Sequence, residues 1–107
     1  MEPTEIIFVE RGREETIVTF MEEKILSQGQ VEQLRGSLMG LIEQAWSEKL
    51  ILDFCNVKGL SSSVLGLLLM MHRKISKEKG RLQLRNISPT IYEIFRITKM
   101  TEIFEII

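Results

Sequence analysis

The chain has 107 residues, which is enough for one domain and too few for two domains with separate cores. Its 44% hydrophobic and 27% charged residues are typical of a globular protein and not of a disordered one. The net charge of −1 argues against a protein that holds nucleic acid or an anionic membrane through bulk charge. A single domain over residues 1–107 is therefore expected.

The chain contains one cysteine, Cys55, and one histidine, His72. These counts exclude an internal disulfide, a multi-cysteine metal site and a paired-histidine metal motif, and we expect no cofactor. The acidic start of the chain lacks the apolar segment of a secretory signal, and no apolar run approaches the ~20 residues that span a bilayer. A soluble cytoplasmic protein without membrane attachment is expected.

The N-terminal part of the chain predicts two strands followed by a helix. Residues 6–10 and 16–20 form the strands, and the polar stretch between them contains the glycine of a hairpin connection. A further short extended segment is expected within residues 21–26. Ser27 with Gln30 forms a capping-box pattern that marks the helix start. The apolar face of this helix comprises Val31, Leu34, Leu38, Leu41, Ile42 and Ala45, with Trp46 near its end.

The next segments alternate between strand and helix. Residues 50–55 are almost continuously apolar, which is typical of a central strand buried on both faces. A polar connection leads to a helix over roughly residues 63–79, with Gly80 predicted in the position just after the helix end. Residues 81–85 alternate between polar and apolar and predict a strand with one solvated face.

A last helix and strand complete the α/β pattern. Ser88 followed by Pro89 marks a helix start, and residues 103–107 are predicted as a short final strand. The inward face of that helix comprises Ile91, Ile94, Phe95 and Thr98. The order β-β-α-β-α-β-α-β favours a mixed sheet of four to five strands covered by three to four helices. Its later strands are expected to pair in parallel through right-handed crossovers.

Three consecutive serines stand at the start of the second predicted helix. Ser61, Ser62 and Ser63 follow the loop after the central strand, at the edge where open α/β sheets place their sites. Serine hydroxyls cap the free N–H groups of a first turn, so a purely structural role is one interpretation. The other is a hydroxyl placed where the positive end of the helix would favour a phosphate. The glycine-rich pattern of a nucleotide-binding loop is absent from this sequence.

The order and spacing of these segments resemble the STAS domain of bacterial anti-sigma factor antagonists. The resemblance centres on residues 50–54 followed by residues 60–69. Residues 80–84 with 86–89 are similar to the family's next strand and helix start, and residues 94–106 to its closing helix and last strand. The match covers most of the chain. It implies a STAS-like fold and a regulatory module that binds other proteins without catalysing a reaction.

The family pattern at this helix start is Asp-Ser-Ser/Thr-Gly-Leu-Gly, in which a partner kinase phosphorylates the hydroxyl before the first glycine. The resemblance puts Ser63 at the phosphorylated position, with Ser62 as the alternative. Ser61 replaces the family's Asp and Val64 replaces its Gly. We expect Val64 to place a branched side chain beside the acceptor, where it would hinder a kinase or reshape the docking surface. The family's Gly-x-x-Asp region after the second strand is replaced by residues 21–24.

The second helix is almost entirely apolar over two turns. Such a helix is either buried on both sides or exposes an apolar patch to a partner. Inward packing is expected of Leu65, Leu68, Leu69 and His72. That arrangement would leave Leu67, Met70 and Met71 outward or flanking the core, unless neighbouring helices cover them. The predicted partner-binding surface comprises Lys58, Leu60, Ser61, Ser62, Ser63, Val64, Leu67, Met70 and Met71.

Charge is distributed unevenly along the chain. Residues 1–48 carry ten acidic and four basic residues, and residues 49–107 carry five acidic and ten basic residues. This asymmetry can orient the domain towards a partner, although ordinary solvated helix faces also explain it. The basic residues after the apolar turns of the second helix include no neighbouring aromatic side chain for stacking a base, so a solvated face is favoured over a nucleic-acid site.

Three hypotheses of function follow from these patterns. The first is an anti-sigma factor antagonist that binds an anti-sigma factor with serine kinase activity, of the GHKL type, and is switched by serine phosphorylation. The second is a STAS-like scaffold or ligand-sensing module without phosphorylation. The third is an enzyme built on Asp53, Cys55 and His72, which no spacing in the sequence supports. A monomer or a weak homodimer is expected.

Overall fold

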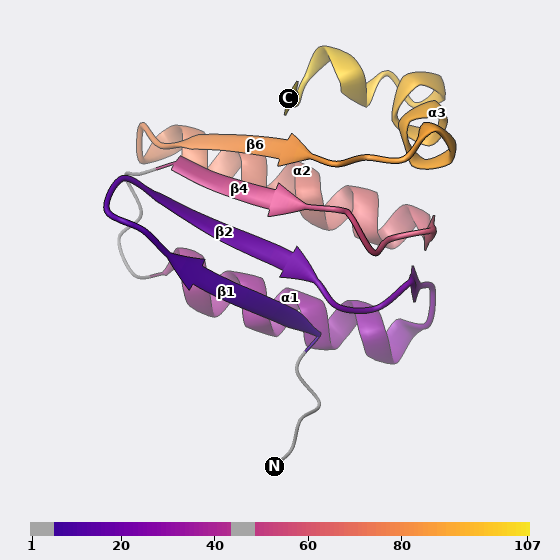
Figure 1. Ribbon diagram of the computed structural model, residues 1–107, viewed down its shortest axis with the longest axis horizontal. Coiled ribbons are helices and arrows are strands. Elements are labelled where there is room, and N and C mark those ends of the chain that lie inside the picture. The colour runs from indigo at the N-terminus through magenta and orange to yellow at the C-terminus, as the bar shows by residue number, and fades with distance from the viewer. Residues whose placement is uncertain (1–5, 44–48) are drawn as a thin grey trace.

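Five strands form one mixed sheet in the computed structural model, which describes residues 6–43 and 49–107 (Figure 1). The strands are β1 (Ile7–Arg11), β2 (Glu15–Phe20), β4 (Lys49–Asp53), β6 (Arg81–Arg85) and β7 (Glu105–Ile106). Their spatial order is β1-β2-β4-β6-β7. β1 pairs with β2 in antiparallel fashion, and all other neighbours are parallel. The predicted mixed sheet, with residues 50–55 contributing its central strand, is confirmed.

Two helices cover one face of this sheet. The helices are α1 (Gln28–Ile42), α2 (Ser62–Lys77) and α3 (Pro89–Ile97), with a single 3₁₀ turn, η1 (Met100–Glu102). Figure 1 shows α1 and α2 side by side behind the sheet, while α3 lies beyond the C-terminal end of β6. None of the helices among the described residues is long and apolar enough to cross a bilayer. The predicted α/β fold class is confirmed.

The core lies between the sheet and these two helices. Leu50 and Leu52 of β4 are fully buried there, because successive side chains of a strand point to opposite faces. The apolar face predicted for the first helix packs against them through Val31, Leu34, Leu38, Leu41 and Ile42. Ala45 and Trp46 lie outside the described residues. Four phenylalanine rings extend the core towards α3 in a chain of edge contacts, Phe20 with Phe54, Phe54 with Phe95, and Phe95 with Phe104.

Local side chains set several boundaries that differ from the sequence predictions. β4 ends at Asp53 and not at Cys55, because the carboxylate of Asp53 accepts a hydrogen bond of 2.9 Å from the Cys55 N–H and turns the chain. α2 ends two residues earlier than predicted, and Lys79, not Gly80, adopts the left-handed conformation after it (φ 63°). The predicted final strand is reduced to β7, because η1 precedes it.

Candidate functional site

The start of α2 is held by a small second sheet. β3 (Lys24–Ile25) pairs in parallel with β5 (Gly59–Leu60). The N–H groups of Lys58 and Gly59 donate to Glu23 O at 2.6 and 3.1 Å, and Ser61 N–H donates to Ile25 O at 3.1 Å. The predicted extended segment within residues 21–26 is confirmed as β3. Its pairing with β5 was not predicted, because two residues are too short for a sequence period.

The start of α1 lies at the same edge of the fold. Ser27 and Gln30 form the predicted capping box, with Gln30 N–H donating to Ser27 Oγ and Ser27 N–H donating to Gln30 Oε1. The Gln30 side chain also accepts from Leu26 N–H and donates to Lys24 O at 2.8 Å. One side chain therefore anchors the segment that pairs with β5. The positive ends of both helices consequently face the edge where the parallel strands end.

The three serines occupy three different environments at the N-terminus of α2. Ser61 is the N-cap residue, but its side chain makes no capping hydrogen bond, and its Oγ is buried without a partner. Ser62 and Ser63 are the first two helical residues, and both are exposed. The helix therefore begins at the serine run, as the capping interpretation predicts, but the hydroxyl of Ser61 does not cap it. Two hydroxyl-bearing residues are left on the surface.

Val64 is fully buried, with 0% exposure. Its side chain belongs to the core cluster on the inner face of α2. Our expectation that this branched side chain lies beside the acceptor on the docking surface was therefore wrong. The reason is helical geometry, because residues 64, 68, 71 and 75 share the buried face, whereas Ser62 and Ser63 precede it on the exposed side.

The apolar side chains of α2 divide between core and surface differently than predicted. Leu65 and Leu68 are buried as expected, whereas Leu69 and His72 are only half-buried. Leu67 and Met71 were placed in the predicted partner-binding surface, with coverage by neighbouring helices as the alternative. They are 2% and 0% exposed, so the alternative in which they are covered is the correct one, and neither belongs to the accessible surface. Met70 is half-buried and flanks the core.

The remaining predicted docking residues lie at the edge formed by β5. Lys58 is exposed, and its Nζ lies 3.9 Å from Glu23 Oε2 in a solvated ion pair. Leu60 is half-buried and packs against the core. The accessible part of the predicted surface is therefore Lys58, Leu60, Ser62, Ser63 and Met70. We refer to these five residues as the α2 docking surface.

A polar cluster at the ends of β4 and β6 lies at the same edge of the sheet. The Asp53 carboxylate accepts hydrogen bonds from Arg85 Nε at 3.0 Å and from Asn86 Nδ2 at 3.1 and 3.2 Å. Burial alone would raise the pKa of Asp53, but the hydrogen bonds from Asn86, Cys55 N–H and Arg85 outweigh it and hold the pKa below its ordinary value. Asn86 is left-handed (φ 57°), which a short amide side chain tolerates.

Sequence reasoning did not identify this cluster. The only available signal was the acidic residue Asp53 inside an apolar strand. A buried carboxylate needs hydrogen-bond donors, so its presence indicates that donors lie nearby, but it does not say on which segment. Cys55 lies on the surface, but partial desolvation of its thiol, together with a hydrogen bond to Asp53 and the charge of that carboxylate, raises the pKa of the thiol. His72 lies on α2, across the sheet from Asp53, with its ring 5.5 Å from that of Phe104. The structure does not bring Asp53, Cys55 and His72 together as a nucleophile set.

The basic stretch that follows the apolar turns of α2 lies on the surface. Its exposed members are Arg73, Lys74, Lys77, Lys79 and Arg81. Arg81 pairs with Glu105 of β7, and Arg85 with Asp53. Among the described residues, no group of three His, Cys, Asp or Glu side chains is arranged to hold a metal ion.

Comparison with known proteins gives a family match over most of the chain. A model of the STAS domain matches residues 9–107. Among curated proteins, none matches the sequence significantly.

Solved structures of anti-sigma factor antagonists share the fold. The unphosphorylated form of the anti-sigma factor antagonist SpoIIAA has a TM-score of 0.77 at 25% identity, covering 94% of this chain and 87% of that chain. The phosphorylated form of SpoIIAA, a Bacillus cell fate determinant, has a TM-score of 0.71 at 25% identity, covering 94% and 90%. An anti-sigma-factor antagonist domain protein from Planctomyces limnophilus has a TM-score of 0.83 at 23% identity, covering 94% and 87%.

Proposed function

Because the chain belongs to the STAS domain family, we propose that it is an anti-sigma factor antagonist switched by phosphorylation of Ser63, with Ser62 as the alternative acceptor. Its partner is an anti-sigma factor that is also a serine kinase of the GHKL type. The unmodified protein binds this partner in the cytoplasm through the α2 docking surface and so releases a sigma factor. Phosphate on Ser63 weakens the complex.

The observation that carries this proposal is the exposure of Ser62 and Ser63 at the N-terminus of a 16-residue helix. A kinase must reach the hydroxyl it modifies, and the first helical turn is the position where an added anion is best tolerated. Similarity to SpoIIAA, whose structure exists in both an unphosphorylated and a phosphorylated form, supports the same assignment.

The rigid support around the serines favours a docking surface. Ser61 N–H is hydrogen-bonded to β3, and Gln30 ties β3 to the start of α1. A surface that does not rearrange loses little conformational entropy on binding, which favours affinity. Phosphate adds about −1.5 to −2 charges at pH 7 to that surface, so the cost of desolvating it on docking rises.

The first test uses a cognate serine kinase of the GHKL type, ATP and intact-mass measurement, followed by mapping of the modified peptide. The wild type is expected to gain one phosphate, Ser63→Ala to gain none, and Ser62→Ala to behave like the wild type. Phosphate on Ser62 alone would move the acceptor to the alternative residue. No phosphate on either serine would exclude the switch and favour the STAS-like scaffold hypothesis instead.

The second test measures binding of the unmodified protein to the same kinase by calorimetry. Lys58→Glu and Met70→Glu are expected to weaken binding by about tenfold or more, because they place charge within a surface that is desolvated on docking. Lys77→Glu is the matched control, because it makes the same charge change at the opposite end of α2. Equal effects of Lys58→Glu and Lys77→Glu would contradict the proposed location of the surface.

A further inference from the structure

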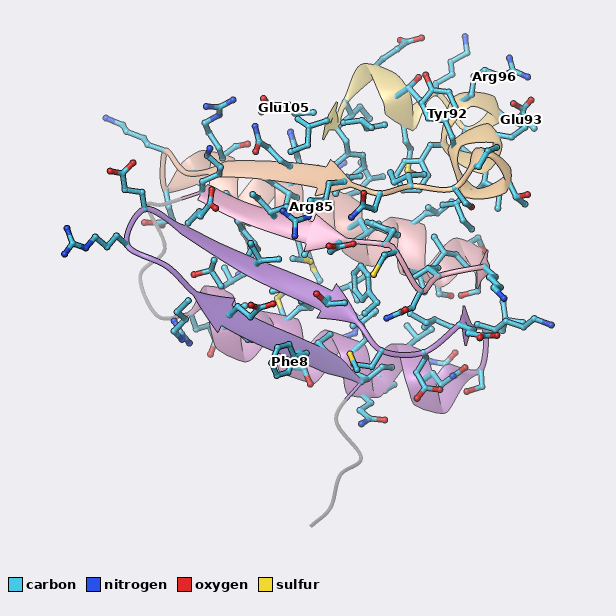
Figure 2. All side chains as sticks on the ribbon, in the orientation of Figure 1. Phe8, Arg85, Tyr92, Glu93, Arg96 and Glu105 are labelled. Atoms are coloured by element: carbon cyan, nitrogen blue, oxygen red, sulfur yellow. The ribbon has the colours of Figure 1, made fainter. Side chains whose placement is uncertain are left out.

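Leu26 is an exposed leucine next to the α2 docking surface. It directly follows β3, and 53% of its surface is accessible. Ser61 N–H donates to Ile25 O at 3.1 Å, so Leu26 lies across from the start of α2. Other exposed apolar side chains stand on other elements, such as Phe8 on β1 and Tyr92 on α3 (Figure 2). Leu26 is thus a large, exposed apolar side chain beside the two surface serines.

The backbone around Leu26 is fixed by hydrogen bonds. Leu26 N–H donates to Gln30 Oε1 at 3.0 Å, and Gln30 Nε2 donates to Lys24 O at 2.8 Å. With the hydrogen bond that Ile25 O accepts, these contacts hold three consecutive residues in place. A partner that covers Leu26 therefore has little backbone to order, and less conformational entropy is lost on binding.

The side chain of Leu26 lies beside Gly59 of β5. A methyl group built on Gly59 would come within 3.9 Å of Leu26 Cδ2 and within 3.5 Å of Lys24 Cγ. Because Gly59 lacks a side chain, it leaves the leucine accessible from this side. The exposed ion pair of Lys58 with Glu23 stands next to Gly59. Protein interfaces have the same arrangement, with an apolar centre inside a polar rim.

A purely structural role explains only part of this arrangement. Leu26 precedes the N-cap Ser27, and an apolar residue in that position often packs against the residue four positions after the cap, here Val31. Val31 is 2% exposed, whereas more than half of the Leu26 surface remains accessible. Packing against α1 therefore accounts for the covered part of Leu26 and not for the exposed part.

A protein that docks on Ser63 is wide enough to cover Leu26. Neighbouring strands lie about 4.8 Å apart, which puts the Cα atoms of Leu26 and Ser63 roughly 10 Å from each other. A standard interface of about 800 Å² per partner is roughly 30 Å across. A kinase centred on the Ser63 hydroxyl therefore extends past Leu26.

We propose that Leu26 is the apolar anchor of the complex with the anti-sigma factor kinase, which offers it an apolar pocket. This inference rests on the proposed function and adds a specificity-determining residue to the α2 docking surface. Leu26 contacts the kinase before and during phosphoryl transfer without touching the reacting hydroxyl. Its contribution is therefore to affinity, measured as Kd and KM, and not to kcat.

Calorimetry with the GHKL-type serine kinase tests the anchor. Leu26→Ala is expected to weaken binding of the unmodified protein by about tenfold or more. Leu26→Met keeps an apolar side chain of similar volume and should bind within about threefold of the wild type. Ile97→Ala is the matched control, because Ile97 is 66% exposed at the end of α3, outside the docking surface, and it should leave binding unchanged. Circular dichroism melts verify that each variant is folded.

Steady-state phosphorylation separates an anchor from a residue that only shapes the serine region. Leu26→Ala should raise KM for the protein substrate by about tenfold and leave kcat within about twofold, because it removes binding that is equal in the ground state and the transition state. Leu26→Met should restore KM. A lowered kcat at unchanged KM, or no recovery in Leu26→Met, would overturn the proposal.

Failure of this inference is distinguishable from failure of the proposed function. If the wild type binds the kinase and gains phosphate on Ser63, while Leu26→Ala binds equally well, only the anchor is wrong. If the wild type neither binds nor gains phosphate, both are wrong. If the wild type forms a dimer in sedimentation equilibrium that Leu26→Ala abolishes, and kinase binding is unchanged, Leu26 contacts a second copy of the chain and is not the kinase anchor.

Discussion

The carboxylate of Asp53 at the end of β4 and the guanidinium of Arg85 at the end of β6 form an ion pair, with Arg85 Nε donating to Asp53 Oδ2 at 3.0 Å. The two residues are register partners on adjacent parallel strands. The pair therefore ties together the two strands that lead into the loops before α2 and α3. Asp53 is almost completely buried, so its charge depends on these donors for solvation.

Asp53→Asn is expected to destabilise the domain by about 1–3 kcal/mol at pH 7, because an amide presents N–H groups to donors that need an acceptor. Urea melts followed by circular dichroism measure the loss. Glu93→Gln is the matched control, because Glu93 pairs with Arg96 on the exposed side of α3. That change should cost less than about 1 kcal/mol, as exposed pairs do. Equal losses of unfolding free energy in the two variants would show that the Asp53 cluster stabilises the domain no more than an exposed ion pair does.

The contribution of Asp53 should also depend on pH. The pKa of this carboxyl is lowered in the folded protein from its ordinary value of 3.8, so the folded state favours the charged form. The resulting stability is fully present above the unfolded pKa and is lost as the pH falls through the lower, folded pKa. The difference in unfolding free energy between wild type and Asp53→Asn should therefore be constant near neutrality and shrink below pH 3.8. A difference that grows in acid would contradict this assignment.

The sequence predicts most of the fold and less of the site. The capping box at Ser27 and the apolar run at residues 50–55 each depend on local spacing, and both features were correctly predicted. The sequence left open whether Leu67 and Met71 are covered, and both were placed in the predicted docking surface, because a helix that is apolar on all sides has no period to orient it. Which side is covered depends on α1, a contact between segments distant in sequence.

The residue that ends α2 was also predicted incorrectly from the local sequence. A glycine is the usual residue for the left-handed position after a helix, so Gly80 was predicted there. The structure places Lys79 in that position instead, with Gly80 N–H donating to Ile75 O at 2.9 Å. The Asp53 cluster was missed for a related reason, because its partners follow on another strand and no local pattern connects them.

Ser61→Ala is expected to change stability by less than about 0.5 kcal/mol, although Ser61 is an N-cap residue. An N-cap serine normally contributes about 1 kcal/mol through its side-chain hydrogen bond, and Ser61 makes none. Ser88→Ala is the matched control, because Ser88 Oγ accepts from Ile91 N–H at 3.2 Å at the start of α3. That variant should lose about 1 kcal/mol in urea melts. A larger loss for Ser61→Ala than for Ser88→Ala would mean that the Ser61 hydroxyl is bonded in solution.

Gly36→Ala and Gly40→Ala should each stabilise the domain by about 0.5–1 kcal/mol. Both glycines lie on the exposed side of α1, and an added Cβ would meet nothing within 4 Å. Alanine loses less backbone entropy than glycine when a helix forms. Gly12→Ala is the contrasting case, because its Cβ would lie 3.0 Å from Glu15 O in the β1–β2 hairpin and should be destabilising. Thermal melts that show no gain for either α1 variant would contradict the expectation.

Val64→Gly restores the residue of the family pattern but is expected to destabilise this domain by about 2–4 kcal/mol. The change empties a fully buried position and adds a glycine to the helix interior. Increased phosphorylation of the variant would then reflect local unfolding of α2 unless its melts match those of Val64→Ala. Val64→Ala also removes buried side-chain volume but keeps high helix propensity, so it separates the loss of core packing from the effect of a glycine in the helix. A loss below about 1 kcal/mol for Val64→Gly would show that residue 64 is not part of the core.

Ser63→Asp should separate folding from binding. Ser63 lies in the first turn of α2 and is exposed, so a carboxylate there meets the positive end of the helix and favours folding by about 0.3–1 kcal/mol. The melting temperature is therefore expected to stay unchanged or rise slightly. Binding to the kinase partner should weaken by about tenfold or more in calorimetry, because the added charge must be desolvated in the complex.

Ser62→Asp is the internal control for this switch. It makes the same charge change one residue earlier in the same helical turn, so its effect on the melting temperature should be similar. Its effect on binding should be smaller, because the register with the family puts Ser63 at the modified position. If Ser62→Asp weakens binding more than Ser63→Asp, the alternative acceptor is the functional one. If Ser63→Asp binds the kinase as tightly as the wild type, the switch is absent and the domain acts as an unmodified scaffold.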